Sequence, residues 1–236
     1  MKSIITIAAV SLVAGTASVA SADDLAYWAQ NSNTLSGGGF GFENGDFPQG
    51  ADFGTQAGSA TLVLSDNLTM DFDGGTGVYN TVQSFSGTAL NAQFGEGSGG
   101  SIAIQNGTGG QNNGEWFELR FDATNYENIA LSFAARATST GFNDVDIDAY
   151  NGDMLLGSIA ADQGWDDWAV ESFGTSLLDG VTDARIRFTF SGGADDSASG
   201  NNRYDNLFIQ GDLVPAPGAA ALFGLAGLTA ARRRRG

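Results

Sequence analysis

The chain of 236 residues contains no cysteine and no histidine. Without cysteine there are no disulfide bonds and no thiolate–metal sites, so the core alone must stabilise the fold. Without histidine, Ser-His-Asp and Cys-His catalytic triads and histidine-ligated zinc or iron are excluded. Chemistry in this protein is therefore restricted to carboxylate pairs and to sites built from oxygen ligands.

Basic residues are also scarce. Lys2 and a terminal arginine cluster supply five of the ten, so residues 23–213 hold five arginines, no lysine and all 27 acidic residues, a net charge of −22. Such a surface repels nucleic acid and anionic lipid head groups. The charge therefore argues against a nucleic-acid partner and is compatible with divalent cations, neutral glycans or a hydrated extracellular matrix.

The first residues have the pattern of a secretory signal peptide. Lys2 precedes an apolar run over residues 4–19, and Ala20-Ser21-Ala22 is an A-x-A-type cleavage site before Asp23. We therefore expect the chain to be exported and residues 1–22 to be removed.

Residues 218–231 carry no charge and are followed by Arg232, Arg233, Arg234 and Arg235. As a helix they would span about 21 Å, less than the roughly 30 Å of a bilayer core, but snorkelling arginine side chains extend a short span. A core helix would need a polar face, and here only Thr229 is polar. We predict a membrane helix over residues 218–231, stopped on the cytoplasmic side by the arginines.

The order Val214-Pro215-Ala216-Pro217-Gly218, apolar segment, arginine cluster resembles the PEP-CTERM sorting signal of bacterial exosortase substrates. Ala216 stands where that family usually has glutamate. The resemblance implies an exosortase-type sorting machinery as partner and a final location in the cell envelope, on the cell surface or in the extracellular matrix. The expected organisation is a signal peptide (1–22), an ectodomain (23–213) and a sorting tail (214–236).

The ectodomain sequence is typical of many short strands joined by tight turns. The chain has 35 glycines and three prolines, and Asn and Asp separate short apolar runs such as residues 61–64 and 68–72. Residues 115–121 alternate, with Trp116, Glu118 and Arg120 on one face. We predict ten to twelve strands and almost no helix.

Asn151-Gly152 lies between two strand patterns and predicts a hairpin. The segments 131–142, 185–194 and 200–207 resemble the jelly-roll ectodomains of PEP-CTERM proteins and, more loosely, carbohydrate-binding modules. The predicted fold is an all-β, jelly-roll-like β-sandwich over residues 23–213.

The strongest single candidate site is the pair Asp205-Asn206 in the last strand. The jelly-roll resemblance implies that this aspartate binds a structural Ca²⁺. Calcium takes six to eight oxygen ligands, so other residues must contribute. The expected co-ligands are Asp195, Asp196 or the loop at Asn201-Asn202, with Glu43 as a further contributor from the N-terminal part of the chain. The alternative is a turn or side-chain cap at the strand start, with Arg203 pairing locally.

A second candidate is a sugar-stacking platform formed by Trp165 and Trp168, which flank two aspartates. The alternative is that one tryptophan fills the core. A further triplet, Asp144, Asp146 and Asp148, is interpreted as the solvated face of a strand.

These observations favour an exported surface or matrix protein with a non-enzymatic binding or structural role. The alternative is a carbohydrate-binding module for exopolysaccharide. A glycoside hydrolase would need two carboxylates about 5 to 9 Å apart across a cleft, and the sequence selects no pair among its 27 acidic residues.

Overall fold

The structure, a computed structural model, describes residues 22–31, 42, 46–70, 82–161 and 166–215. The predicted signal peptide up to residue 21, the helix at 218–231 and the arginine cluster lie outside these residues, as do Ala216, Pro217, Gly218, Glu43 and Trp165. No helix in the described ranges is long and apolar enough to cross a membrane.

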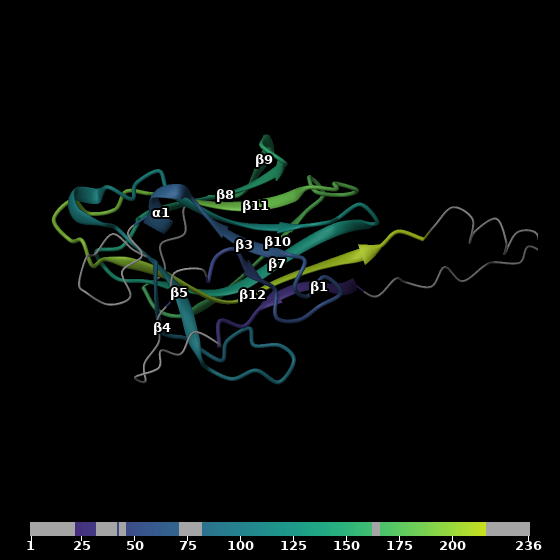
Figure 1. Cartoon of the computed structure of the whole chain (residues 1–236), viewed down its shortest axis with the longest axis horizontal. Helices are drawn as coiled ribbons and strands as arrows, with labels where there is room; N and C mark the ends of the chain where they lie inside the picture. Colours follow the sequence, from purple (N-terminus) through teal and green to yellow (C-terminus); the bar gives the residue numbers. More distant parts are fainter. Residues whose placement is uncertain (1–21, 32–41, 43–45, 71–81, 162–165, 216–236) are drawn as a thin grey trace, which may run out of the picture.

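Within the described residues, twelve strands form two six-stranded antiparallel sheets that pack face to face (Figure 1). The β12 sheet contains β1 (Ala22–Trp28), β4 (Val82–Ser86), β5 (Gly100–Gln105), β7 (Tyr126–Ala137), β10 (Ala169–Thr175) and β12 (Asn201–Leu213). The β11 sheet contains β2 (Gln49–Gly50), β3 (Thr61–Leu64), β6 (Trp116–Phe121), β8 (Asp144–Asn151), β9 (Met154–Ala160) and β11 (Ala184–Ser191).

The last eight strands pair as one long ribbon folded at the turn between β8 and β9. In this ribbon β8 pairs with β9, β7 with β10, β6 with β11 and β5 with β12. The ribbon winds so that β10-β7-β12-β5 are neighbours in one sheet and β6-β11-β8-β9 in the other. This is the strand order of a jelly roll, so the predicted all-β, jelly-roll-like sandwich is confirmed for the described residues.

The hairpin predicted at Asn151-Gly152 is confirmed, since Asn151 pairs with Met154 across the turn. The strand predicted over residues 68–72 is wrong, because residues 66–70 form the short helix α1 (Asp66–Met70) directly after β3. Its Leu68 is fully buried. An apolar run of this length does not distinguish a strand from a helical turn, and here the chain turns away from the sheet edge.

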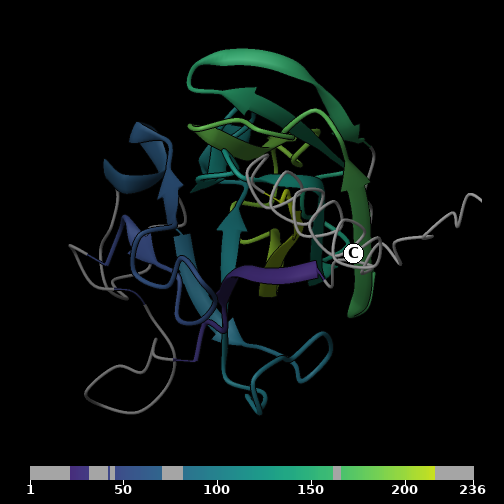
Figure 2. The same ribbon diagram turned by 90° about the vertical axis from the view of Figure 1, so that its right-hand side faces the viewer.

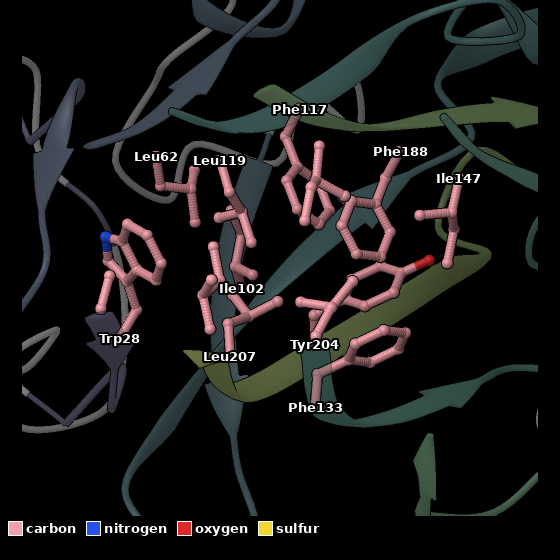
Figure 3. Packing of buried hydrophobic residues seen from close by; sticks show 14 of the residues in the cluster. Trp28, Leu62, Ile102, Phe117, Leu119, Phe133, Ile147, Phe188, Tyr204 and Leu207 are labelled. Carbon is pink, nitrogen blue, oxygen red and sulfur yellow. The ribbon is translucent and has the colours of Figure 1, made fainter. Parts of the chain in front are cut away.

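The core lies between the sheets and is rich in aromatic rings. Along β11, alternate residues such as Phe188 and Phe190 point inward and are fully buried. Phe188 stacks on Phe117 of β6 at 4.4 Å between ring centroids, and Tyr204 of β12 meets both rings edge-on. Figure 3 shows these rings meeting between the layers, with Trp28 at the other end of the cluster. Each such side chain contributes roughly 1.5–3 kcal/mol by leaving water.

Candidate functional site

The outer face of the β12 sheet is covered by residues 87–99, the β4–β5 loop, which extends below the layers in Figures 1 and 2. The pairing of β12 with β7 shifts register between Asp205 and Phe208, and Asn206 has a φ of 52°. Asparagine is one of the few residues that adopt this left-handed conformation readily. The irregularity places both Asp205 and Asn206 under the loop.

Asp205 and Asn206 hold the loop by hydrogen bonds. The Asp205 carboxylate accepts the backbone N–H of Thr88 at 2.7 Å and that of Asn206 at 2.8 Å. The Asn206 amide donates to the carbonyl oxygens of Thr88 and Leu90 at 2.8 and 2.9 Å, and its Oδ1 accepts from the Tyr27 hydroxyl. Both side chains are fully buried. The pair therefore fixes the loop to the last strand.

Burial raises the pKa of the Asp205 carboxyl to about 7, although the N–H groups of Thr88 and Asn206 partly offset it. A buried carboxyl without a cationic partner favours its neutral form. Asp205 therefore changes charge near neutral pH.

The structure does not bring Asp195 and Asp196, two of the expected calcium ligands, to this pair. Asp195 and Asp196 are exposed in the loop between β11 and β12, where the Asp195 side chain neighbours Gly110, and Glu43 lies outside the described residues. Within the described ranges no group of three or more acidic side chains is placed to hold a metal ion. The calcium site stays a prediction that depends on Asp205 and Asn206.

Beside the β4–β5 loop lies a cavity of about 390 Å³, lined by Ala29, Asn31, Asp52, Phe53 and Glu96. At its edge the Phe53 ring stacks on the Phe94 ring, with 5.0 Å between centroids and 13° between planes. Phe94 is 47% exposed and is held at a φ of 55°. A non-glycine residue in this conformation at the surface is uncommon and points to a functional constraint.

Polar groups converge on the same cavity. The Asp52 carboxylate accepts the backbone N–H of Ala29 at 2.8 Å, and the Asn31 amide donates to Glu96 at 2.5 Å. The Asn31 Oδ1 is enclosed and has no hydrogen-bond partner among the described residues. Partial burial, and to a lesser degree the negative charge of Glu96, raise the pKa of Asp52. The cavity thus combines apolar rings with hydrogen-bond acceptors.

The outer face of the β11 sheet carries a closed ionic network instead. Glu118, predicted to share a face with Trp116 and Arg120, does so, but it is fully buried under arginine side chains. It accepts from Arg120 at 2.5 Å and from Arg187 at 2.8 Å, with Arg185 at 3.5 Å. The guanidinium of Arg187 also lies 4.1 Å from the Trp116 ring. Because these groups satisfy one another, we interpret the network as structural.

No protein-family model and no curated protein matches this sequence. Among solved structures, the chain is similar to the CBM22-1 xylan-binding domain from Paenibacillus barcinonensis Xyn10C, at 16% identity over 84% of this chain and 99% of that chain, with a TM-score of 0.43. It is also similar to TmCBM61, solved with β-1,4-galactotriose, at 12% identity over 64% and 86% of the two chains and a TM-score of 0.36. The K2 cleaved adhesin domain of Lys-gingipain gives 9% identity over 65% and 89%, with a TM-score of 0.39.

The structure describes only one of the two tryptophans that were predicted to stack on sugar. Trp165 lies outside the described residues, and Trp168 is half-buried just before β10, outside the buried core. The stacking role of this pair stays a prediction. Asp144 and Asp146 are exposed and Asp148 is half-buried on β8, which confirms that this triplet forms the outward face of the strand.

Sequence reasoning missed the cavity residues Asn31, Asp52, Phe53, Phe94 and Glu96. They come from three segments of the chain, and Phe53 and Phe94 carry a usable local signal, since each is an aromatic residue within a glycine-rich connection. Such an aromatic residue is worth testing as a binding residue in any loop of this kind.

Proposed function

We propose that this β-sandwich is a non-enzymatic module of an exported protein and binds a carbohydrate in the cavity between Phe53, Asp52 and Glu96. One observation carries the proposal: the Phe53 ring, two carboxylates and one amide line a single cavity, and the exposed ring of Phe94 stacks on Phe53. A sugar ring presents an apolar C–H face and a rim of hydroxyl groups. The aromatic edge suits the C–H face, and the oxygen acceptors suit the hydroxyl groups.

The charge of the cavity also points to a sugar-like ligand. Asp52 and Glu96 line it with carboxylate oxygens, and the Asn31 amide holds Glu96 by a hydrogen bond of 2.5 Å. Carboxylates accept hydrogen bonds from hydroxyl groups and repel anions, so the cavity favours a neutral, hydroxyl-rich ligand over an anionic one.

Hydrogen bonds and ring contacts anchor the loop that forms one wall of the site. Phe94 and Glu96 belong to the β4–β5 loop, which Asp205 and Asn206 hold to β12. Phe94 also meets the ring of Phe208 edge-on at 6.1 Å. A preformed site loses little conformational entropy on binding, which raises affinity.

A direct test is a glycan array of neutral oligosaccharides probed with the purified protein, with the variant Asp52→Asn beside it. We expect wild-type protein to bind at least one class of neutral glycan and Asp52→Asn to bind it more weakly. Absence of binding to every neutral glycan would contradict the proposal.

A second candidate function, glycoside hydrolysis, is favoured by the placement of Asp52, with its raised pKa, beside Glu96 in one cavity. Two carboxylates, one of them with a pKa raised by burial, are the machinery of that reaction. Release of reducing sugar from a bound glycan, abolished in both Asp52→Asn and Glu96→Gln, would establish it. Binding without release supports the module.

Export and sorting are the second half of the proposal. They are supported by the sequence patterns of residues 1–22 and 214–236, including Val214 and Pro215, which directly follow β12. The first residue of β1 and the end of β12 lie side by side, since Ala22 pairs with Asp212. Mass spectrometry of the protein from its native cells gives both termini. A first residue at Asp23 is expected, and a retained Met1 would contradict export.

A further inference from the structure

The five arginines between residues 23 and 213 fall into two groups. Five ion pairs are formed among the described residues, and all involve Arg120, Arg185 or Arg187. Arg136 and Arg203 take part in none of them. In a segment with 27 acidic residues, a guanidinium that forms no ion pair needs a separate explanation.

Arg136 on β7 and Arg203 on β12 lie directly opposite each other in the pairing of the two strands. Because the residues beside them, Ala135 and Tyr204, face the core, both arginine side chains point to the outer face of the β12 sheet. Both are half-buried there. Like charges directly opposite on neighbouring strands destabilise a sheet. The pair therefore costs folding free energy in the absence of an anion.

One acidic residue, Asp205, lies two positions from Arg203 on the same strand, but it accepts from the N–H groups of Thr88 and Asn206 and forms no ion pair with either arginine. The Nε of Arg203 donates to the Asn201 side chain at 2.9 Å, and its guanidinium lies 4.4 Å from the centre of the Phe85 ring on β4. The Nε of Arg136 is enclosed and has no hydrogen-bond partner within the described part of the chain. Burial, followed by the charge of Arg136, lowers the pKa of Arg203.

These features match a site for an oxyanion. Two guanidinium groups present planar arrays of donors that fit carboxylate or sulfate oxygens, and both side chains are half-buried, so part of each remains open to solvent. The Phe85 ring supplies an apolar surface beside the charge. Continuing the register of Ala169 with Ala135 by one residue would bring Trp168 opposite Arg136, which adds a second aromatic residue to the same face.

We propose that Arg136 and Arg203 bind the carboxylate or sulfate group of an acidic sugar residue. The sugar part of this inference rests on the proposed carbohydrate-binding function, because β12 carries both this pair and the residues that hold the cavity loop. The Arg136–Arg203 site would bind an anionic substituent, whereas the cavity at Phe53 would bind neutral hydroxyl groups. A polysaccharide with both neutral and acidic units is the class of ligand that fits.

The test follows the side-chain Nε–H NMR signals of the arginines in ¹⁵N-labelled protein titrated with glucuronate, glucose 6-sulfate and glucose. These probes share one ring and differ in a carboxylate, a sulfate or a hydroxyl group. We expect the signals of Arg136 and Arg203 to shift with at least one anionic sugar and not with glucose. A response to only one anion identifies the substituent, and no response to either overturns the proposal.

Variants Arg136→Gln and Arg203→Gln should each bind the anionic sugar at least tenfold more weakly, since each removes a charge-assisted contact. Arg120→Gln makes the same change in net charge on the opposite sheet and should bind normally. An equal loss in all three variants would overturn the site, because it would reflect net charge alone.

The melting temperature measured without any anion distinguishes an anion-binding site from an internal ion pair. Removing either Arg136 or Arg203 should change it by less than about 2 °C, because lost repulsion offsets lost contacts. A larger fall would mean that an acidic residue of the chain already neutralises the pair, and the proposal would fail. If glucuronate binds here while neutral glycans fail to bind anywhere, the proposed function falls and this anion site stands.

Discussion

The hydroxyl of Tyr27 on the first strand donates a hydrogen bond to Oδ1 of Asn206 on the last strand, across 179 positions of the chain. The Tyr27 ring also lies 5.5 Å from Phe94, and its hydroxyl accepts the backbone N–H of Gln93. Burial raises the pKa of Tyr27 to about 12, so the hydroxyl remains a donor at physiological pH. The pairing of the chain ends thereby supports the loop that carries the candidate site.

Asn206→Ala should loosen this loop. It removes three side-chain hydrogen bonds and places alanine at a φ of 52°, so we expect a loss of about 3 kcal/mol in unfolding free energy. Urea unfolding and amide exchange of Thr88 and Gln93 measure the two effects. Asn206→Gly is the control for backbone strain: it should recover part of the stability while exchange stays fast. Unchanged exchange in both variants would show that Asn206 does not hold the loop.

Asp205 should give the protein a specific pH dependence. Its folded pKa of about 7 lies above the unfolded value of 3.8, so the neutral carboxyl contributes stability that is fully present below about pH 4 and is lost as the pH rises through 7. The variant Asp205→Asn cannot titrate. The stability of wild type minus that of the variant should therefore fall between pH 4 and 8, and a constant or rising difference would contradict the assignment.

Calcium binding at the predicted site would require the charged form of the same Asp205 carboxyl. A bound cation favours the charged form. If Asp205 ligates calcium, then added Ca²⁺ at pH 8 should raise the melting temperature of wild type and leave Asp205→Asn unchanged. A melting temperature that is insensitive both to Ca²⁺ and to a chelator would remove the calcium prediction while leaving the hydrogen-bonding role of Asp205 intact.

Glu118→Gln should be among the most destabilising single substitutions on the outer faces. Glu118 is fully buried and accepts from the guanidinium groups of Arg120 and Arg187, so the neutral amide leaves these charges uncompensated. We expect a loss of about 3 kcal/mol in chemical denaturation. The matched control is Asp153→Asn, because Asp153 also pairs with an arginine but is 95% exposed, and it should cost less than about 0.5 kcal/mol. Equal effects of the two variants would refute the network.

Local patterns of the sequence predicted much of the fold. The strand at residues 61–64, the alternation around Glu118 and the hairpin at Asn151 depend on neighbours a few positions apart, and all three are confirmed. The helix at Asp66–Met70 was missed because five residues do not reveal a period.

The candidate site was less accessible to sequence reasoning. Asp205 and Asn206 could be singled out, but their hydrogen bonds to Thr88 and Leu90 arise from the winding of the strands, which no local spacing encodes. The contact between Phe53 and Phe94 joins two loops and has the same origin. Long-range pairs of this kind follow from topology rather than from periodicity.

The central claim is that the exposed ring at the cavity edge binds sugar, and the variant Phe94→Ala tests it most directly. Affinity electrophoresis in gels containing neutral glucans, galactans, xylans or mannans compares wild type, Phe94→Ala and Leu90→Ala, whose side chain is 43% exposed on the same loop. We predict that wild type and Leu90→Ala are retarded equally by at least one polysaccharide and that Phe94→Ala, run at a temperature well below its melting temperature, binds it at least tenfold more weakly. Equal retardation of Phe94→Ala and wild type, or no retardation of wild type, would contradict the account.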